Sequence, residues 1–595
     1  MIVPPLFLLS GGTALLYQVA FGKKLATIFG ATAYAVSAVL TAFMAGLALG
    51  SHLGGKYGKH VRRPLVAYGV AEIVVGAICV LTPSSFEAVT SAYLALARSA
   101  PASLPFLSAL RTVLTMLVVA VPTVAMGLTL PFLAKAVAGE RVSETETERS
   151  RRRLTLLYAV NTAGGALGAL VAAYFVIPSL GLYTTMRAAA LVNFAIGGLA
   201  IWVGRDPAWA IEQAPAVEAD DKPEQQEADH ESLVDSSEPG WILGLVACAS
   251  GLLVFSAEVV DTHLLTLLIG NSAYAFGLML AAFLSCLSIG AALASSVDRK
   301  LGRHALPVTL LASGVVSLLS VPLWGQMPSV FLAAGQHVVS WAGREFVRAA
   351  VAFGVLALPT VVMGLTFPLL LRRVAGRASV GRHVGRLTAI NTLGSIVGSL
   401  TCAYLLLPFF GSERSLVILG VCFGACGLLL LRDKDQRRWR PVAAALLGII
   451  VLGLPRWDMK QMTNGANVYF DTQSPPDELL FVREDVHGGL TSVARRGAVR
   501  TLYTNGKFQG NDAHEVIAQR SFAHIPTSFV KRYDRALVIG LGTGTTVGTI
   551  ATYPFTAIEL AEISPAIVEA AEQYFQKPNR GALSDPRVEL VMNDG

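Results

Sequence analysis

The sequence predicts a polytopic α-helical membrane bundle followed by a smaller α/β domain. The chain of 595 residues is 53% hydrophobic and only 15% charged, which is too apolar for an ordinary soluble protein. Apolar stretches of about 20 residues, the length that crosses a bilayer, recur as far as residue 431. Beyond residue 460 the pattern changes to short alternating stretches, and a glycine-rich loop lies between two apolar strands. The chain therefore combines a membrane part with a soluble part.

The predicted bundle consists of apolar stretches in two sets of six, with one shorter stretch after them. They occupy residues 4–22, 30–53, 65–82, 106–134, 154–178, 185–203, 241–262, 272–297, 305–324, 346–371, 387–410, 414–431 and 441–455. The last is shorter than the usual span of about 20 residues and is a possible thirteenth span. All six cysteines lie inside these stretches, so the sequence predicts neither a disulfide framework nor a metal site.

The membrane part contains an internal duplication. Residues 122–131, Pro-Thr-Val-Ala-Met-Gly-Leu-Thr-Leu-Pro, return at 359–368 with two changes. Asn161-Thr162 returns as Asn391-Thr392, in each case before a run rich in Gly and Ala or Ser. The sequence therefore predicts two parallel six-helix repeats, residues 1–205 and 240–431. Between them, residues 206–239 are acidic and rich in Gln, Pro and Ala, which predicts a disordered cytoplasmic linker.

Basic residues in the short loops predict the orientation. Lys and Arg gather at 56–63, 299–303 and 372–386, which lie on one side if each stretch crosses once. Lys23 and Lys24 lie on the other side, but they are outnumbered. We expect an integral membrane protein, in the bacterial inner (plasma) membrane, with a cytoplasmic N-terminus. The same loops explain the net charge of +7, and no nucleic-acid partner is expected.

The side of the membrane that holds the C-terminal domain depends on residues 432–460, a basic loop followed by the short apolar stretch. If that stretch crosses, the domain faces outward. If it lies in the interface, the domain faces the cytoplasm, where a nucleoside cofactor is made. The supply of cofactor favours the cytoplasm.

Two polar residues at membrane depth occupy equivalent positions of the duplication. Gln18 lies in the first stretch, and Glu258 lies in the seventh. Ionisable groups at such a depth face the bundle interior or a water-filled cavity, and they often mark functional sites. The alternative is that Glu258 packs helices together, protonated or paired with His263. We expect Gln18 and Glu258 to face inward and to approach each other near the pseudo-twofold axis.

The C-terminal part predicts a small β-meander, residues 461–510, and a Rossmann-like, methyltransferase-type unit, residues 511–595. Strands are expected at 468–470, 479–482, 490–493 and 499–503, with a turn at Asn505-Gly506 and a helix at 512–523. The strand 536–539 then leads into Gly540-Leu-Gly542-Thr-Gly544, and a second strand ends at Glu562. In such units glycines let the backbone approach a nucleotide, and the acidic residue binds ribose hydroxyls.

A helix at 565–575 and a third strand at 588–592 complete the predicted unit. A doubly wound sheet with three strands has a bare edge, so we expect the chain to be truncated and inactive as a transferase.

The C-terminal motifs resemble the spermidine synthase (polyamine aminopropyltransferase) family. They are the run 502–509, His524-Ile-Pro526, the glycine loop, Glu562-Ile-Ser-Pro565 and Asp594-Gly595. The whole chain resembles the fused MFS/spermidine synthase branch. The resemblance implies transfer of an aminopropyl group from decarboxylated S-adenosylmethionine to a small-molecule amine at the lipid bilayer.

The resemblance also implies roles for six residues of a nucleoside pocket. Gly540, Gly542 and Gly544 would lie beneath the nucleoside and Glu562 at the ribose. Asp594 would lie at the adenine, and Gln509 would line the pocket. The family's catalytic Asp is expected beyond Gly595.

The sequence departs from the family at places where carboxylates would hold cationic ligands. Asn505 stands where the soluble enzymes have Asp, and Thr543 replaces the Asp of their glycine loop. Ala518-Gln519-Arg520 replaces their Tyr-His-Glu. Two alternatives therefore stay open: a transporter with a nucleoside- or polyamine-sensing domain, and a methyltransferase-like enzyme that uses S-adenosylmethionine itself.

Overall fold

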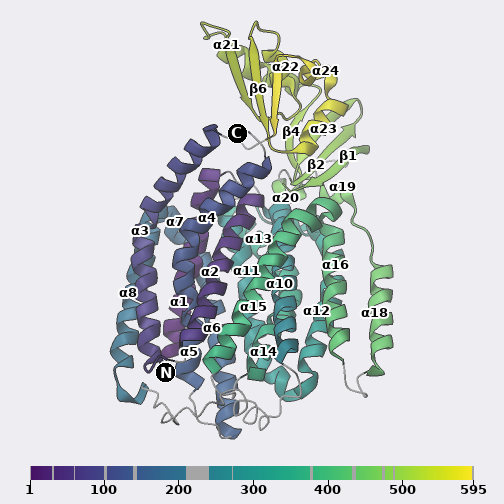
Figure 1. Cartoon of the computed structure of the whole chain (residues 1–595). Helices are drawn as coiled ribbons and strands as arrows, with labels where there is room; N and C mark the ends of the chain where they lie inside the picture. The colour runs from purple at the N-terminus through teal and green to yellow at the C-terminus, as the bar shows by residue number, and fades with distance from the viewer. Residues whose placement is uncertain are drawn as a thin grey trace.

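The computed structural model shows a bundle of long helices with an α/β domain on one end (Figure 1). The structure describes residues 2–29, 33–58, 60–99, 104–138, 144–209, 240–270, 273–374, 380–431, 437–471, 476–486 and 489–592. The predicted architecture, a polytopic bundle fused to a Rossmann-like domain, is confirmed.

The first half of the bundle contains eight α-helices among the described residues. They are α1 (Val3–Phe29), α2 (Ala33–Gly58), α3 (Pro64–Ser99), α4 (Leu104–Gly127), α5 (Thr129–Ala138), α6 (Glu144–Val171), α7 (Ile177–Leu180) and α8 (Leu182–Gly204). A π-helical turn, Ala172–Val176, joins α6 to α7, and a 3-10 turn, Pro207–Trp209, follows α8.

The second half follows the same order. Its helices are α10 (Gly240–Ile269), α11 (Ala273–Leu301), α12 (Ala305–Gly335), α13 (Trp341–Gly364), α14 (Thr366–Val374), α15 (Val380–Thr401) and α16 (Leu407–Leu430), with α18 (Arg440–Gly453) after them. A π-helical turn, Cys402–Leu406, again separates α15 from α16. In the part of the chain that the structure describes, ten helical segments are long and apolar enough to cross a membrane, and five of them contain residues of two consecutive helices.

Close helix contacts at aligned glycines recur in the two halves. A Cβ on Gly168 would lie 2.1 Å from the carbonyl oxygen of Gly12, and one on Gly398 would lie 2.1 Å from that of Leu252. Only glycine permits α1 to approach α6, and α10 to approach α15, this closely. The breaks before the last helix of each half also match, because Gly181 and Gly411 have φ values of 74° and 69°.

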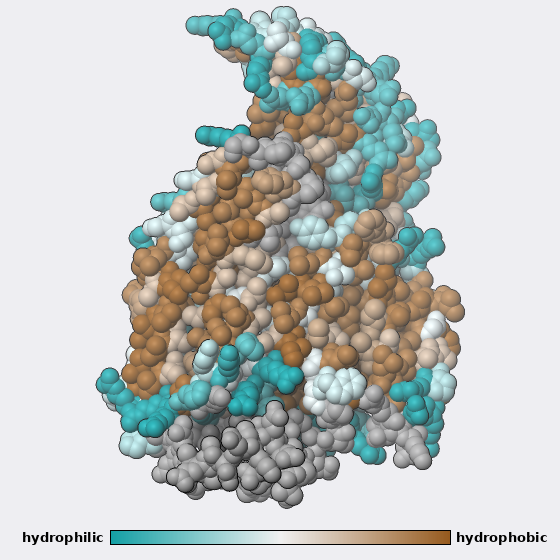
Figure 2. Space-filling model, viewed as in Figure 1, coloured by the Kyte–Doolittle hydropathy of each residue, from teal (hydrophilic) through white to brown (hydrophobic). Residues whose placement is uncertain are grey.

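The outside of the bundle is apolar between hydrophilic ends (Figure 2). Large side chains such as Leu191 (69% exposed), Leu429 (70%) and Ile449 (67%) face outward. A soluble protein would not present so large an apolar surface, whereas the hydrocarbon core of a bilayer would cover it.

The C-terminal domain contains two sheets. The first is antiparallel, in the order β1 (Glu478–Asp485), β2 (Gly489–Arg496), β3 (Val499–Thr504) and β4 (Lys507–Asn511). The second is parallel, in the order β5 (Arg535–Ile539), β6 (Ala557–Glu562) and β7 (Val588–Met592). Helices α21 (Glu515–Thr527), α22 (Thr545–Ile550), α23 (Pro565–Tyr574) and α24 (Gln576–Asn579) accompany them. The buried residues Val538, Val547, Ile558 and Leu560 form the core beside β6.

One predicted strand is wrong. Residues 468–470 do not pair in the meander, because Ala466–Tyr469 form the short helix α20, soon after α19 (Met459–Met462). The Asn464 side chain accepts a hydrogen bond from the amide of Ala466, which starts that helix. Phe470 then turns into the left-handed region (φ 58°), and its ring packs against Phe331 of α12. This tertiary contact outweighs the strand preference of the local sequence.

The short apolar stretch near residue 450 forms α18, which runs beside the bundle. The Leu447 side chain occupies the space above Gly424 of α16, where a Cβ would lie 2.6 Å from it. In Figure 1, α18 starts near the end of the bundle that holds the N-terminus and leads toward the C-terminal domain at the opposite end. The N-terminus and the C-terminal domain therefore lie at opposite ends of the bundle, and the side of the membrane that each one faces stays a prediction.

Candidate nucleoside site and its junction with the bundle

The glycine loop joins the end of β5 to the start of α22. Gly540, Gly542 and Gly544 have φ values of 86°, 53° and 78°, a region that side chains with a Cβ rarely adopt. A Cβ on Gly540 or Gly542 would meet no atom within 4 Å, so the space above the loop is open. The loop thus presents backbone to a free space at the carboxyl end of a parallel strand, where ligands bind in such folds.

Glu562 holds this loop in place. Its Oε2 accepts from the amide of Leu541 (2.7 Å), and its Oε1 accepts from the amides of Ile563 (2.8 Å) and Ser564 (2.9 Å). The residue is only 5% exposed. A carboxylate offers about four acceptor positions, so one position on Oε2 remains for a ligand hydroxyl. Sequence reasoning placed Glu562 beside the loop, and the structure brings the two together.

Two of the residues that depart from the family pattern bond to each other. The Thr543 hydroxyl donates to Oε1 of Gln519 (2.6 Å), and the Thr546 hydroxyl donates to the backbone carbonyl of Gln519 (3.1 Å). Gln519 Nε2 lies 3.5 Å from the carbonyl oxygen of Gln509. Neutral groups thus tie α21, β4 and the glycine loop together. Sequence reasoning noted both substitutions but missed their pairing.

The other residues singled out from the sequence do not contact the glycine loop through their side chains, or they lie outside the described residues. Gln509 is exposed in the middle of β4, and its backbone, rather than its side chain, makes the contact with Gln519. Asp594 lies outside the described residues. Asn505 forms the turn between β3 and β4 (φ 53°), and its Oδ1 accepts from the amide of Leu490 (2.7 Å), so its role there is structural. The buried Asn579, which no sequence signal marked, donates to the carbonyls of Thr543 and Ala571.

The domain docks on the bundle through the carboxylate of Glu484 in β1. His263 Nε2 of α10 lies 3.0 Å from its Oε1. The amide of Ser412 donates to both carboxylate oxygens, at 3.2 and 3.1 Å, and the Ser412 hydroxyl also donates to Oε1. Since Ser412 follows the break at Gly411, the carboxylate caps a helix N-terminus, where negative charge is favoured.

Apolar and amide contacts extend this junction. The Trp457 indole donates to the carbonyl of Val321 in α12 (2.8 Å), and the Asn467 amide donates to that of Leu267 in α10 (2.9 Å). The guanidinium groups of Arg344 and Arg348 lie over the ring of Phe470, at 5.2 and 5.5 Å from its centre. The domain and the segment that precedes it therefore contact α10, α12 and α13 of the second half.

Burial alone would raise the pKa of Glu484, but the hydrogen bonds and charge of His263 and the hydrogen bonds of Ser412 hold it below its ordinary value of 4.5. A carboxyl group with a lowered pKa stabilises the docked state above that ordinary value. The stabilisation is lost as the pH falls through the lowered pKa.

Gln18 and Glu258 are both buried, on α1 and α10 respectively, with 4% and 8% exposure. Neither side chain makes a hydrogen bond to a residue that the structure describes. Their mutual approach stays a prediction. No group of three or more His, Cys, Asp or Glu with the geometry of a metal site occurs among the described residues.

Comparison with known proteins defines the class of the C-terminal domain. Residues 515–595 match a family model described as the spermine/spermidine synthase domain. The chain therefore carries a spermidine synthase domain behind a bundle of apolar helices.

Curated relatives agree with this class. The polyamine aminopropyltransferase of Corynebacterium efficiens is 28% identical over 369 residues, which cover 60% of this chain and 66% of that protein. Polyamine aminopropyltransferase 2 of Aquifex aeolicus is 25% identical over 350 residues, 57% of this chain and 65% of that protein. The chain thus spans slightly less than two thirds of these relatives. Both matches are longer than residues 454–595, so they include part of the bundle.

Among solved structures, the human organic anion transporter MFSD10 is 15% identical, and the match covers 72% of this chain and 98% of that one. Its TM-score is 0.41, too low to define the fold of the bundle.

The first prediction concerns Glu562. We expect Glu562→Ala to weaken binding of S-adenosylmethionine and of its decarboxylated form at least about tenfold, because a charged hydrogen bond contributes about 1.5 kcal/mol or more. The change also frees the amides of Leu541, Ile563 and Ser564. Calorimetry on the full-length protein in nanodiscs measures the affinities. Glu559→Gln, on the same strand, is the matched control and should bind normally. Unchanged affinity of Glu562→Ala for both ligands would refute the assignment.

The second prediction concerns Glu484. We expect Glu484→Ala to loosen docking at pH 7, because it removes the acceptor of His263 and Ser412. Spin labels at Val339→Cys on the bundle and Arg532→Cys on the domain, both over 80% exposed, report the distance between the parts. The distribution should be narrow in the parent at pH 7 and broad in the variant. It should also broaden in the parent as the pH falls below 4.5.

Asp585→Asn is the control for this experiment, because the Arg587 side chain likewise lowers the pKa of Asp585, far from the bundle. That variant should keep the narrow distribution. If the distance distribution of Glu484→Ala is as narrow as that of the parent, contacts other than Glu484 suffice to hold the domain on the bundle.

Proposed function

We propose that the protein is a membrane-bound transferase that moves an aminopropyl group from decarboxylated S-adenosylmethionine to an amine. The observation that carries this proposal is the open glycine loop fastened to Glu562, at the start of a unit that matches the spermine/spermidine synthase domain. The curated relatives, which are named polyamine aminopropyltransferases, support it.

The reaction is a displacement at carbon. The amine nitrogen uses its lone pair to bond to the aminopropyl carbon next to the sulfonium. The carbon–sulfur bond breaks with its electron pair going to sulfur, and methylthioadenosine leaves. The amine then gives up a proton to a base. The glycine loop and Glu562 would hold the nucleoside so that the carbon is in line with the amine, which lowers the entropic part of the barrier.

A second candidate reaction has a specific observation in its favour. The buried Thr543 side chain, bonded to Gln519, stands where the aminopropyltransferase family has a carboxylate for its cationic ligands. A loop without that charge also suits S-adenosylmethionine, and the corresponding activity would be methyl transfer.

The third prediction separates these reactions. The protein, expressed from its whole gene so that any residues beyond Gly595 are included, is placed in nanodiscs and offered putrescine with either S-adenosylmethionine or its decarboxylated form. The products are identified by mass spectrometry. We expect an aminopropylated amine and methylthioadenosine, formed only with the decarboxylated donor. A methylated product with S-adenosylmethionine would establish the second candidate. Neither product, in a protein that binds both nucleosides, would contradict the transferase proposal.

We further propose that the C-terminal domain faces away from the cytoplasm. The basic ends of α2, α11 and α14 (Lys56, Arg299 to Lys300 and Arg372 to Arg373) lie at the end of the bundle away from this domain. The C-terminal end of α10 contacts the domain, through the carbonyl of Leu267. Because basic loops stay in the cytoplasm, this arrangement supports a cytoplasmic N-terminus and an external domain.

The fourth prediction tests this topology. A membrane-impermeant maleimide added to intact spheroplasts should label Arg532→Cys on the domain, but it should label Lys300→Cys at the end of α11 only after the membrane is permeabilised. The six native cysteines lie inside helices of the bundle and should react little. The reverse labelling pattern would place the domain in the cytoplasm.

A further inference from the structure

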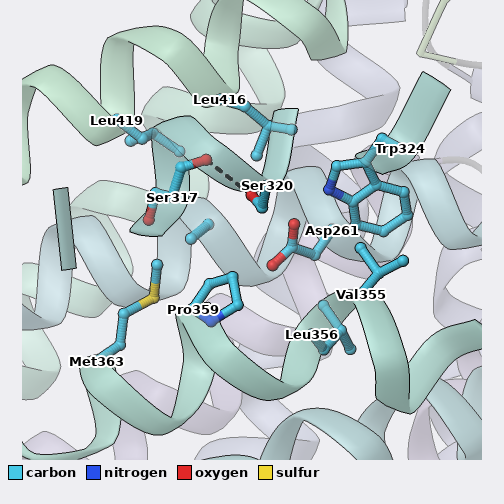
Figure 3. Close-up of a pocket in the computed structure, with 11 residues that line it drawn as sticks. Asp261, Ser317, Ser320, Trp324, Val355, Leu356, Pro359, Met363, Leu416 and Leu419 are labelled. Carbon is cyan, nitrogen blue, oxygen red and sulfur yellow. Dashed lines mark hydrogen bonds between the residues drawn. The ribbon is translucent and has the colours of Figure 1, made fainter. Parts of the chain in front are cut away.

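A cavity lies inside the second half of the bundle, between α10, α12, α13 and α16 (Figure 3). Its wall consists of Ala257, Asp261, Ser317, Ser320, Trp324, Val355, Leu356, Pro359, Met363, Leu416 and Leu419. The free space takes a group about the size of a water molecule, which is also the size of an ammonium group. Most of the wall is apolar, so its few polar atoms determine what it can bind.

The carboxylate of Asp261 projects into this cavity (Figure 3). The residue is 6% exposed, and its side chain has no hydrogen bond or ion pair with any residue that the structure describes. No Lys, Arg or His is among the lining residues. A buried carboxylate without a partner is costly at membrane depth, so it needs a cation or a proton.

The other polar side chains of the wall include two serine hydroxyls, whose oxygens can accept hydrogen bonds. Ser317 Oγ is buried without a hydrogen-bond partner, and the Ser320 hydroxyl donates its proton to the carbonyl of Ser317 (2.7 Å). Pro359 lies inside α13 and has no N–H, so the carbonyl of Val355 lacks its helical donor. The Trp324 ring, which also lines the cavity, belongs to the side chain that attracts cations best.

This set of groups fits one class of ligand. An alkylammonium group is a cation with three donors and no acceptor. It would meet a carboxylate, hydroxyl oxygens and an aromatic ring in a space of its own size. A neutral alcohol could not neutralise Asp261, and an anion would be repelled by it.

The first half of the bundle has no such arrangement at the aligned position. The alignment that pairs Gln18 with Glu258 pairs Phe21 with Asp261. Phe21 is fully buried, and its ring lies 5.8 Å from that of Tyr17 and 5.6 Å from that of Phe86. Apolar packing thus fills the place that Asp261 has in the second half.

The buried carboxylate of the first half, Glu72, is also different. It accepts hydrogen bonds from the Ser10 hydroxyl (2.5 Å) and the Asn193 amide (2.7 Å). The carboxylate of Glu72 therefore has hydrogen-bond partners inside the packed bundle. The carboxylate of Asp261 has none among the residues that the structure describes.

The cavity lies close to the docking junction. Asp261 precedes His263, the partner of Glu484, by two residues on α10. Trp324 follows Val321, whose carbonyl binds Trp457, by three residues on α12. An occupant of the cavity is thus within one helical turn of two contacts that hold the domain.

We propose that this cavity binds the protonated head of a small primary amine, with Asp261 as the anionic partner. The site lies in the bundle, apart from the glycine loop, and does not depend on the reaction proposed above.

Equilibrium binding of radiolabelled putrescine tests this site, with the full-length protein in nanodiscs and in a Glu562→Ala background that disables the nucleoside loop. Saturable binding is expected, with no competition from 1,4-butanediol, the neutral analogue. Asp261→Asn should raise the dissociation constant at least about tenfold, since it removes a charge-assisted bond. Asp261→Glu should retain part of the affinity, and Ser317→Ala should lose a smaller part.

Glu72→Gln is the matched control, because it makes the same chemical change at a carboxylate that already has its partners, and it should bind putrescine normally. The melting temperature of each variant confirms that it is folded. The proposal is overturned if the folded parent binds no putrescine, or if Asp261→Asn binds it with unchanged affinity. Either result would mean that the cavity holds only a protonated carboxyl group and water. The reaction proposed for the C-terminal domain is tested separately, by the products of the transferase assay.

Discussion

The carboxylate of Glu484 is the contact on which the arrangement of the two parts depends. One side chain accepts from a histidine of α10 and from the backbone and hydroxyl at the start of the broken helix α16. The break exists because Gly411 adopts a positive φ, which leaves the amide of Ser412 without a helical partner. The C-terminal domain thus supplies the acceptor for the Ser412 amide, which has no acceptor within its own helix. The same contact orients the glycine loop relative to the bundle.

Much of the fold could be predicted from the sequence, because hydrophobic length and alternation are local properties. The helical spans, the strands around the glycine loop and the position of Glu562 all followed from such patterns. Residues 468–470 did not, because the Phe470 ring is held by Phe331 and by Arg344 and Arg348, which are distant in sequence. The pairing of Gln519 with Thr543 and the bonding of Glu484 were missed for the same reason, since neither has a periodic or motif signal.

The departures from the family pattern have a common structural consequence. Thr543 stands where the resemblance implies an Asp, and Gln519 stands where it implies a His, and the two neutral side chains form a hydrogen bond between α21 and the glycine loop. The proposed nucleoside site has the glycine loop and the carboxylate of Glu562, which accepts from the amide of Leu541. Meanwhile the bundle has an unpartnered carboxylate, Asp261, in a cavity near the junction.

The most direct test of the central claim is a cryo-electron microscopy structure of the full-length protein with decarboxylated S-adenosylmethionine. The account predicts the nucleoside above Gly540 and Gly542, with a ribose hydroxyl within hydrogen-bond distance of Oε2 of Glu562. Density for the nucleoside elsewhere, or a glycine loop that stays empty at saturating ligand, would contradict it.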